Sequence, residues 1–289
     1  MKLISGIDIG SHSTKLEIFK VKHKNKLKRV LKENSYLYFY QDINSSSSIS
    51  DDSVNELVKI LNNYKSIIAS YSCEVIKVIA TSAFRDANNS NEIIKYIKEN
   101  LDLEIEIISG EEEAKYSQLA FLSLNLDSPN SVIFDLGGGS TEVTYFKNNE
   151  VIKSHSFDIG VIRCISDRSD TNWNNLISFL PKEKEDYLCL GLGSSVRRFA
   201  KMIHQKKKKK IYTIKKEDVE SFEKILVNKG TDYVEKKYNL NGLEPTYLKT
   251  IVRLLLTCYN TLNIETIYYY PISIRLGVAY TILKELNIK

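Results

Sequence analysis

A thirteen-residue pattern occurs twice in this chain and limits what the chain can fold into. It reads DIGSHSTKLEIFK from Asp8 and DLGGGSTEVTYFK from Asp135, 127 positions later. Six positions are identical, and they include the aspartate, the first glycine and the Ser-Thr pair of the turn. Solenoid repeats are shorter, so this recurrence indicates two related half-domains that each carry the same loop. We expect the two loops to face each other across a cleft.

Length and composition are those of a globular protein. The 289 residues suffice for two domains that join near residue 125. With 43% hydrophobic and 27% charged residues, no apolar run approaches the ~18 residues that a membrane span needs. The N-terminus enters a strand pattern without a secretory leader, which predicts a cytoplasmic protein with no membrane partner. The four cysteines are widely separated and form no CxxC pair, so neither a disulfide framework nor a zinc site is indicated.

Basic residues give the chain a net charge of +5. The sequence is rich in Lys, Asn, Ile and Tyr throughout, so the net charge alone says little about partners, and it indicates no specific nucleic-acid partner. The run Lys206–Lys210 is the sharper feature. It is either a solvated loop or a handle for a long polyanion, because clustered ammonium groups attract phosphates without fixed geometry.

Strand and helix patterns alternate along both halves, which is typical of an α/β fold. The first half opens with strand patterns to about Phe39, and the polar stretch QDINSSSSISDD predicts a loop. A helix pattern then places Val54, Leu57, Leu61 and Tyr64 on one face. The second half restarts this order at SVIFDL, and three to four helices follow later.

The two repeated loops have the composition of phosphate sites. In each, a strand ends at an aspartate and is followed by glycine and hydroxyl residues. Small residues let backbone N–H groups approach phosphate oxygens, and hydroxyls add donors. A carboxylate repels phosphate, so the aspartates are expected to act through a bridging hydrated Mg²⁺.

Three further stretches define a narrower resemblance. ATSAFRDA (80–87), ISGEEEA (108–114) and FDLGGGSTE (134–142) occur in this order, together with VIRCISD, GLGSS and SIRLG. The chain resembles the family of exopolyphosphatases and guanosine pentaphosphate phosphohydrolases, within the superfamily of actin, sugar kinases and chaperone ATPases. The resemblance implies two duplicated ribonuclease H-like (actin-like ATPase) domains with an interdomain cleft. The predicted domains are 1–124, with the C-terminal helix 274–289 packed back on it, and 125–273.

The resemblance also implies roles for single residues. Glu113, directly before the small residue of SGEEEA, corresponds to the catalytic glutamate that deprotonates water. Arg85 is expected to bind a terminal phosphate, for which a guanidinium suits better than an ammonium. The metal, Mg²⁺ or Mn²⁺, is assigned to Asp8, Asp135 and Glu142. Phosphate binding is assigned to the loop residues, which are Gly10, Ser11, Ser13, Gly137, Gly138, Gly139 and Ser140.

Other positions depart from the family pattern. Ser194 stands where a second glycine is usual, and it puts nucleotide binding in doubt if the position needs a positive φ. Leu276 replaces an acidic residue beside Arg275 and Gly277. His12 stands where asparagine is usual, and a lone histidine without a partner at ligand spacing is read as a polar turn residue.

These observations predict a metal-dependent hydrolase that removes terminal phosphate from inorganic polyphosphate or guanosine pentaphosphate. Two alternatives remain. A small-molecule kinase of the same superfamily would need a competent adenosine site. A non-catalytic sensor of polyphosphate or guanosine tetraphosphate would have no need of Glu113. Family members often dimerise, so the resemblance also allows a homodimer.

Overall fold

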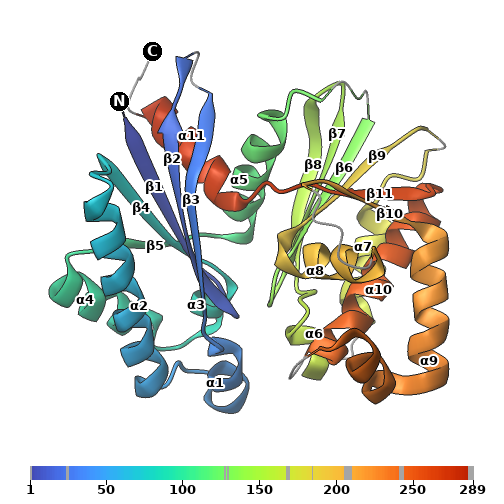
Figure 1. Ribbon diagram of the computed structural model, residues 1–289, viewed down its shortest axis with the longest axis horizontal. Helices are drawn as coiled ribbons and strands as arrows, with labels where there is room; N and C mark the ends of the chain where they lie inside the picture. The colour runs from blue at the N-terminus through green and yellow to red at the C-terminus, as the bar shows by residue number, and fades with distance from the viewer. Residues whose placement is uncertain are drawn as a thin grey trace. The chain divides into compact units, whose positions relative to one another are not determined.

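The chain divides into two compact units, each built on one sheet (Figure 1). The computed structural model describes residues 2–23, 26–126, 128, 130–166, 170–183, 185–204, 210–240 and 244–285. Unit 1 comprises Met1–Leu124 and Ser273–Lys289, and unit 2 comprises Asn125–Ile272. Residues 206–209 of the lysine run lie outside the described ranges. Within those ranges, none of the helices has both the length and the apolar character that crossing a bilayer requires.

The sheet of unit 1 has the strand order β3-β2-β1-β4-β5. Strand β2 runs antiparallel to both of its neighbours, β1 and β3, whereas β4 runs parallel to β1 and β5 runs parallel to β4. The strand bounds are β1 (Leu3–Ile9), β2 (Ser13–Val21), β3 (Leu27–Tyr36), β4 (Val75–Ala80) and β5 (Ile105–Ile107). The helices are α1 (Phe39–Ser46), α2 (Asp51–Ser70), α3 (Ser82–Asp86), α4 (Ser90–Leu101), α5 (Gly110–Leu122) and α11 (Ile274–Glu285).

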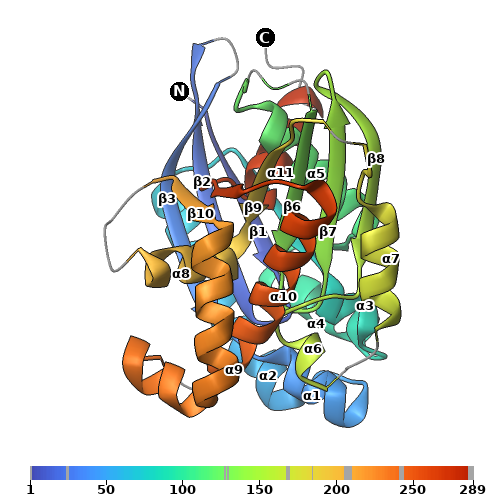
Figure 2. The same ribbon diagram turned by 90° about the vertical axis from the view of Figure 1, so that its right-hand side faces the viewer.

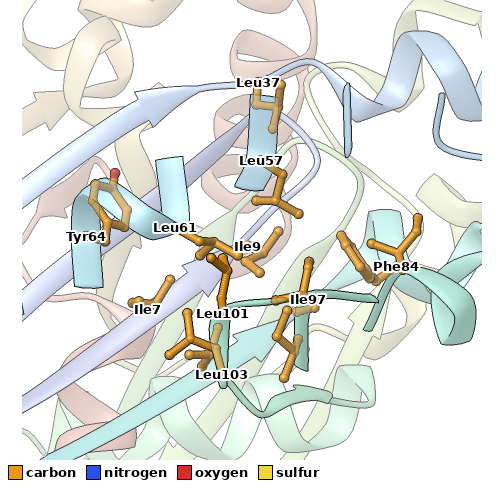
Figure 3. Close-up of a cluster of buried hydrophobic side chains, with 14 of the residues drawn as sticks. Ile7, Ile9, Leu37, Leu57, Leu61, Tyr64, Phe84, Ile97, Leu101 and Leu103 are labelled. Carbon is orange, nitrogen blue, oxygen red and sulfur yellow. The ribbon is translucent and has the colours of Figure 1, made fainter. Parts of the chain in front are cut away.

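Alternation along β1 assigns its side chains to two buried faces. Ile7 and Ile9 join a core with Leu61 and Tyr64 of α2 (Figure 3). Ile4, on the opposite face, joins a second core formed with α5 and α11. Asp8 has the parity of Ile4, so its carboxylate belongs to the α11 face of the sheet.

The predicted loop QDINSSSSISDD is wrong in part, because α1 (Phe39–Ser46) runs through its start. Phe39 is fully buried and anchors the helix in the core of unit 1. Asp42 then stabilises the polar end, since its carboxylate accepts hydrogen bonds from the N–H and the hydroxyl of Ser50. The polar residues of this stretch predicted a loop, whereas the burial of Phe39 stabilises a helix there.

The sheet of unit 2 repeats the topology of unit 1. Its order is β10-β11-β9-β6-β7-β8, with β6 antiparallel to β7 and parallel to β9, as β1 is to β2 and β4. The strand bounds are β6 (Asn130–Leu136), β7 (Thr141–Lys147), β8 (Glu150–Phe157), β9 (Leu188–Leu192), β10 (Tyr212–Lys215) and β11 (Thr266–Tyr269). The predicted duplicated α/β architecture is confirmed, because the order β8-β7-β6-β9-β11 repeats the order β3-β2-β1-β4-β5, and β10 is added at the edge of the second sheet. The cleft between the loops stays a prediction.

The helices of unit 2 surround this sheet. They are α6 (Arg163–Ser166), α7 (Thr171–Phe179), α8 (Gly193–Ile203), α9 (Lys216–Tyr238) and α10 (Glu244–Leu262). Helices α9 and α10 pack side by side (Figure 2). Helix α8 follows β9 directly, so its first residues lie at the same sheet edge as the end of β6.

Candidate active site

The two repeated loops, loop 1 (Gly10–Ser13) and loop 2 (Gly137–Ser140), close in the same way. The N–H of Gly10 donates to the carbonyl of Ser13 at 3.1 Å, and that of Gly137 donates to the carbonyl of Ser140 at 2.9 Å. An added Cβ would lie 3.3 Å and 3.1 Å from these same carbonyls. Gly10 and Gly137 therefore shape the turns, and each N–H is engaged within its own loop.

Loop 2 is tied down by the segment that begins α6. The carbonyls of Gly137 and Gly138 accept from Val161 and Ile162 at 3.1 Å and 2.9 Å, and the carbonyl of Gly139 accepts from Arg163 Nε at 2.6 Å. A trans peptide directs its N–H away from its C=O. The N–H groups of residues 138–140 therefore point away from this segment, as an anion-binding nest requires.

Gly160 permits this close approach of two loops in unit 2. A Cβ at this position would lie 2.1 Å from the carbonyl oxygen of Gly138, and real atoms do not approach so closely. Any side chain at Gly160 would push loop 2 out of place. Sequence reasoning gave Gly160, which directly precedes the VIRCISD motif, no role.

Loop 1 is tied to α3, the helix that carries Arg85. The hydroxyls of Ser11 and Ser82 lie 2.7 Å apart and are buried. Thr81, which precedes the helix, donates its N–H to the carbonyl of Ile9 at 3.1 Å. Within unit 1, these hydrogen bonds thus fix the position of loop 1 relative to the helix that carries Arg85.

Asp135 and Glu142 stand directly opposite each other on β6 and β7. Opposed residues of an antiparallel pair share a face, with Cβ atoms about 4.5–5.5 Å apart, and like charges in this position are destabilising. In the first copy of the repeat, Lys15 occupies the position of Glu142 and pairs with Asp8. The second copy therefore places two carboxylates where the first places a carboxylate and an ammonium.

Neighbouring residues shape the surroundings of this pair. The hydroxyl of Ser156 donates to Glu142 Oε1 at 2.8 Å, and Glu142 is only 4% exposed. Gly193 has φ +93°, and a Cβ there would lie 2.6 Å from the carbonyl oxygen of Leu136 and 3.0 Å from Asp135 Oδ1. Glycine at 193 thus avoids a clash with the backbone of β6 and with the Asp135 carboxylate.

Ser194 lies in the first turn of α8, one residue after the glycine with positive φ. Its backbone has no positive φ, so the substitution of serine for the usual glycine causes no strain. The sequence put nucleotide binding in doubt only if Ser194 needed a positive φ, and the structure shows that this condition is not met.

The Asp135–Glu142 pair fits a small divalent cation by its donor chemistry. Mg²⁺ is commonly bound by one or two carboxylates together with waters and substrate phosphates. Across the described part of the chain, no group of three or more His, Cys, Asp or Glu side chains could hold a metal by itself. A cation here would offset the repulsion between the opposed carboxylates.

Glu113 and Arg85 form an ion pair in unit 1. Arg85 Nη1 lies 3.0 Å from Glu113 Oε2 and donates a further hydrogen bond to the carbonyl of Ile108 at 2.9 Å. Their side chains are 14% and 24% exposed. Both remain within reach of solvent, and the arginine orients the carboxylate.

The three glutamates of SGEEEA have different surroundings. Ser109 caps α5 in a capping box with Glu112, whose pKa is lowered by hydrogen bonds from the backbone and hydroxyl of Ser109. Glu111 is exposed. Glu113 alone contacts Arg85. The structure thus assigns Glu112 to helix capping and leaves Glu113 as the glutamate suited to chemistry.

Ser109→Ala should lower the free energy of unfolding by about 1 kcal/mol, since it removes the hydroxyl that accepts from the N–H of Glu112. Urea denaturation followed by circular dichroism measures this change. Glu111→Gln, in the same turn but outside the capping box, is the matched control and should cost less than half as much. Equal losses in the two variants would contradict the capping assignment.

Asp8 is paired with a cation. Arg275 Nη1 lies 2.6 Å from Asp8 Oδ2, and Nη2 lies 3.4 Å from Glu17 Oε1. Asp8, Glu17 and Arg275 are all buried. Glu17 also contacts Arg29 and Lys32 at 3.2 Å and 3.8 Å, and the surrounding cations help to hold its pKa low against the opposing effect of burial.

Lys32 should react unusually fast with amine reagents. Burial and the cations Arg275, Arg29 and Lys15 lower its pKa from 10.5 to about 8, although Glu17 opposes the shift. At pH 8 about half of its amines are then neutral, against about 0.3% for an ordinary lysine. Because the folded pKa is lowered, the contribution of Lys32 to stability rises with pH from about 8 to about 10.5.

Limited reductive methylation at pH 8, read by peptide mass spectrometry, measures that reactivity. The side chain of Lys32 is itself 34% exposed, so Lys28, an exposed residue of the same strand, is an internal control matched in access to the reagent. Lys32 should be modified well before Lys28. Equal rates would mean that Lys32 has an ordinary pKa.

His12 lies between two tyrosines. Its ring makes edge contacts with Tyr36 and Tyr38, at centroid distances of 5.7 Å and 4.7 Å. These contacts agree with its reading as a turn residue.

Comparison with known proteins shows which family the chain belongs to. A model of the Ppx/GppA phosphatase family matches residues 18–172. The chain belongs to this family. The matched segment contains Arg85, Glu113 and all of loop 2.

Curated relatives carry related names. The chain is 32% identical over 169 residues to the bifunctional 3-dehydroquinate synthase/phosphatase of Fusobacterium nucleatum, covering 56% of this chain and 26% of that protein. It is 28% identical over 169 residues to exopolyphosphatase 2 of Mycobacterium tuberculosis, covering 55% and 53%. It is 26% identical over 229 residues to the guanosine-5'-triphosphate,3'-diphosphate pyrophosphatase of Aeromonas salmonicida, covering 72% and 45%. The chain thus spans about half or less of the length of these relatives.

Solved Ppx/GppA structures share the fold along the whole chain. A crystal structure of an exopolyphosphatase from Cytophaga hutchinsonii superposes with a TM-score of 0.85 at 20% identity, covering 98% of both chains. The Ppx/GppA family member from Aquifex aeolicus gives 0.81 at 21% identity, also over 98% of both. These likenesses establish the architecture of this Ppx/GppA chain.

Sequence reasoning missed the residues that support this Ppx/GppA site. Ser156, Gly160 and Arg163 hold Glu142 and loop 2, and Arg275 holds Asp8. The sequence offered one signal for two of them, because Arg163 and Arg275 lie within the family-like motifs VIRCISD and SIRLG. Nothing in the sequence indicated which partner each would contact.

Proposed function

We propose that this chain is a phosphoanhydride hydrolase that releases terminal phosphate from inorganic polyphosphate, from guanosine pentaphosphate, or from both. Water is the nucleophile, and Mg²⁺ or Mn²⁺ is the cofactor. The names of its relatives from M. tuberculosis and A. salmonicida support these two substrate classes. Both substrates end in a phosphoanhydride that carries several negative charges, so one arrangement of cation and amide donors suits either.

The opposed pair Asp135–Glu142 beside loop 2 carries the proposal. The two carboxylates would hold a divalent cation, and the backbone N–H groups of loop 2, whose carbonyls are tied back, would bind the phosphate. A Ppx/GppA fold without this pair would have only a polar turn here. The bound metal would neutralise charge on the phosphate oxygens.

Each predicted residue has a role in this proposal. Glu113 accepts the proton of the attacking water, and Arg85 binds the terminal phosphate through its guanidinium. Asp135 and Glu142 bind the metal, while Asp8 acts on the metal or its waters. The phosphate-binding groups of the loops are the N–H groups of Gly138, Gly139 and Ser140 and the hydroxyls of Ser11, Ser13 and Ser140. Gly10 and Gly137 contribute the shape of the turns.

The ion pair of Arg85 with Glu113 has a further consequence for this mechanism. A terminal phosphate competes with Glu113 for the guanidinium, since Arg85 Nη1 contacts the carboxylate directly at 3.0 Å. Substrate binding would then release the carboxylate toward water at the moment when a base is needed. In this proposal, phosphate binding would be coupled to the availability of the base, and the ion pair of Arg85 with Glu113 supports this coupling.

Phosphate release measured with malachite green tests the proposal. Long-chain polyphosphate and guanosine pentaphosphate are each assayed with Mg²⁺, with Mn²⁺ and with EDTA. We expect release from at least one substrate, abolished by EDTA and restored by added metal. Absence of release from both substrates with either metal would overturn the proposal, and calorimetry would then show whether the chain binds them as a sensor.

A further inference from the structure

Arg275 lies at the point where the chain returns to unit 1. Ser273 and Arg275 both contact residues of the first two strands, more than 250 positions away in sequence. The hydroxyl of Ser273 donates to Glu17 Oε2 at 2.7 Å, and Arg275 bridges Asp8 and Glu17. Arg275 is 4% exposed. Four side chains thus form one buried network that ends at Asp8.

Arg275 packs against strand β1. Gly6 lies between Ile4 and Asp8 on the α11 face of β1, and a Cβ added there would make an ordinary van der Waals contact with Arg275 Cβ at 3.6 Å. The guanidinium reaches the carboxylates of Asp8 and Glu17 from this position. Glu17 is on the neighbouring strand β2, directly across from Gly6.

The network fixes the orientation of the Asp8 carboxylate. Oδ2 accepts from Arg275 at 2.6 Å, whereas Oδ1 is the oxygen that approaches loop 1, since it lies 3.9 Å from the Cβ position of Gly10. A planar guanidinium bound to two carboxylates has little rotational freedom. Holding one oxygen of Asp8 therefore directs the other toward the loop.

We propose that Arg275 is a positioning residue that directs Asp8 Oδ1 toward loop 1 for the metal-bound phosphate, and that Glu17 and Ser273 hold Arg275 in turn. The inference rests on the proposed function, because it gives Asp8 a role in metal or phosphate binding. Groups that orient a metal ligand or its waters typically change metal affinity or activity by about 10- to 100-fold. Arg275 acts through Asp8 and touches no reacting atom.

The first experiment measures Mn²⁺ binding by electron paramagnetic resonance, which needs no turnover. Arg275→Lys keeps the charge but not the fork that bridges two carboxylates, and should weaken Mn²⁺ binding about 10-fold or more. Arg29→Gln is the matched control, since Arg29 contacts the same oxygen of Glu17 at 3.2 Å. It should leave Mn²⁺ affinity within about twofold of wild type. Equal affinities in wild type and Arg275→Lys would overturn the inference.

A double-mutant cycle separates positioning from general stability. If Arg275 acts through Asp8, then Arg275→Lys should have no further effect on Mn²⁺ affinity in an Asp8→Asn background. Effects that add in full would show that Arg275 works independently of Asp8. Glu17→Gln, which preserves the shape of the network, should weaken Mn²⁺ binding in the same direction and to a smaller degree. It serves as the test if the Arg275 variant does not fold, and an unchanged affinity would overturn the inference.

Kinetics give an independent readout. Arg275→Lys should lower kcat and raise the Mg²⁺ concentration for half-maximal activity, with little change in KM for polyphosphate. Thermal unfolding of each variant corrects for the fraction of folded protein. If wild type bound Mn²⁺ but released no phosphate, the proposed function would fail while the Mn²⁺ cycle still decided the role of Arg275.

Discussion

Glu113→Gln should reduce the rate of phosphate release by about 10²- to 10⁴-fold, because the amide cannot accept the proton of the attacking water. Its effect on stability should be small. The amide oxygen can still accept the hydrogen bond that Arg85 Nη1 donates at 3.0 Å, so the fold around α5 is preserved. KM should not rise, since the glutamate acts on water and the neutral amide competes less strongly than the carboxylate with the terminal phosphate for Arg85. Steady-state kinetics with saturating Mg²⁺ measure both constants.

The neighbouring glutamates are the matched controls for this variant. Glu111→Gln changes an exposed carboxylate in the same turn, and Glu112→Gln changes the capping residue. Glu111→Gln should retain full activity, and Glu112→Gln should lose stability more than rate. A Glu113→Gln enzyme with wild-type kcat would show that another group, or no protein base, activates the water.

Asp135→Asn should lower phosphate release by about 10²-fold or more at moderate Mg²⁺, since a metal can supply several kcal/mol of charge stabilisation. Higher Mg²⁺ should restore part of the activity, because Glu142 still offers one carboxylate. In EDTA the variant should be no less stable than wild type, since one of two opposed like charges is gone. Kinetics across a Mg²⁺ titration and urea denaturation in EDTA measure these effects.

The control for Asp135→Asn is Asp186→Asn, which changes an exposed aspartate of unit 2 close to β9. It should behave as wild type in both measurements. If Asp135→Asn lost activity equally at all Mg²⁺ concentrations and also lost stability in EDTA, Asp135 would be a structural residue and the metal assignment would be wrong.

The repeat carried most of the predictable information. It indicated a duplicated fold, and the two sheets do share one topology. The repeat also contains the position seven residues after each aspartate, which is occupied by Lys15 and by Glu142, although only Glu142 was given a role. What it left out is that these positions lie directly across from the aspartates. Each aspartate faces the residue seven positions later because the four-residue loop between the two strands sets the register of their pairing.

Long-range partners escaped sequence reasoning for a physical reason. Arg275 and Asp8 are 267 positions apart, and no local pattern encodes which buried carboxylate an arginine will reach. The same holds for Arg85 and Glu113, which are 28 positions apart in different elements. Both members of that pair were predicted as site residues, but their contact was not.

Local reasoning failed where one buried side chain outweighed the surrounding polarity. Helix α1 forms in a serine-rich stretch because Phe39 enters the core. Nucleotide binding was questioned because Ser194 replaces a glycine. The residue with a positive φ in this loop is Gly193, and Ser194 has none. A shift of one residue was enough to change the interpretation of the loop.

The most direct test of the central claim is hydrolysis of polyphosphate and of guanosine pentaphosphate by the wild-type chain with Mg²⁺ in water enriched in oxygen-18. Attack by water on the terminal phosphorus predicts released phosphate that carries one solvent oxygen, which mass spectrometry detects, and no release when EDTA is present. Phosphate released without solvent oxygen, or transfer of the terminal phosphate to an added acceptor in place of water, would contradict the account.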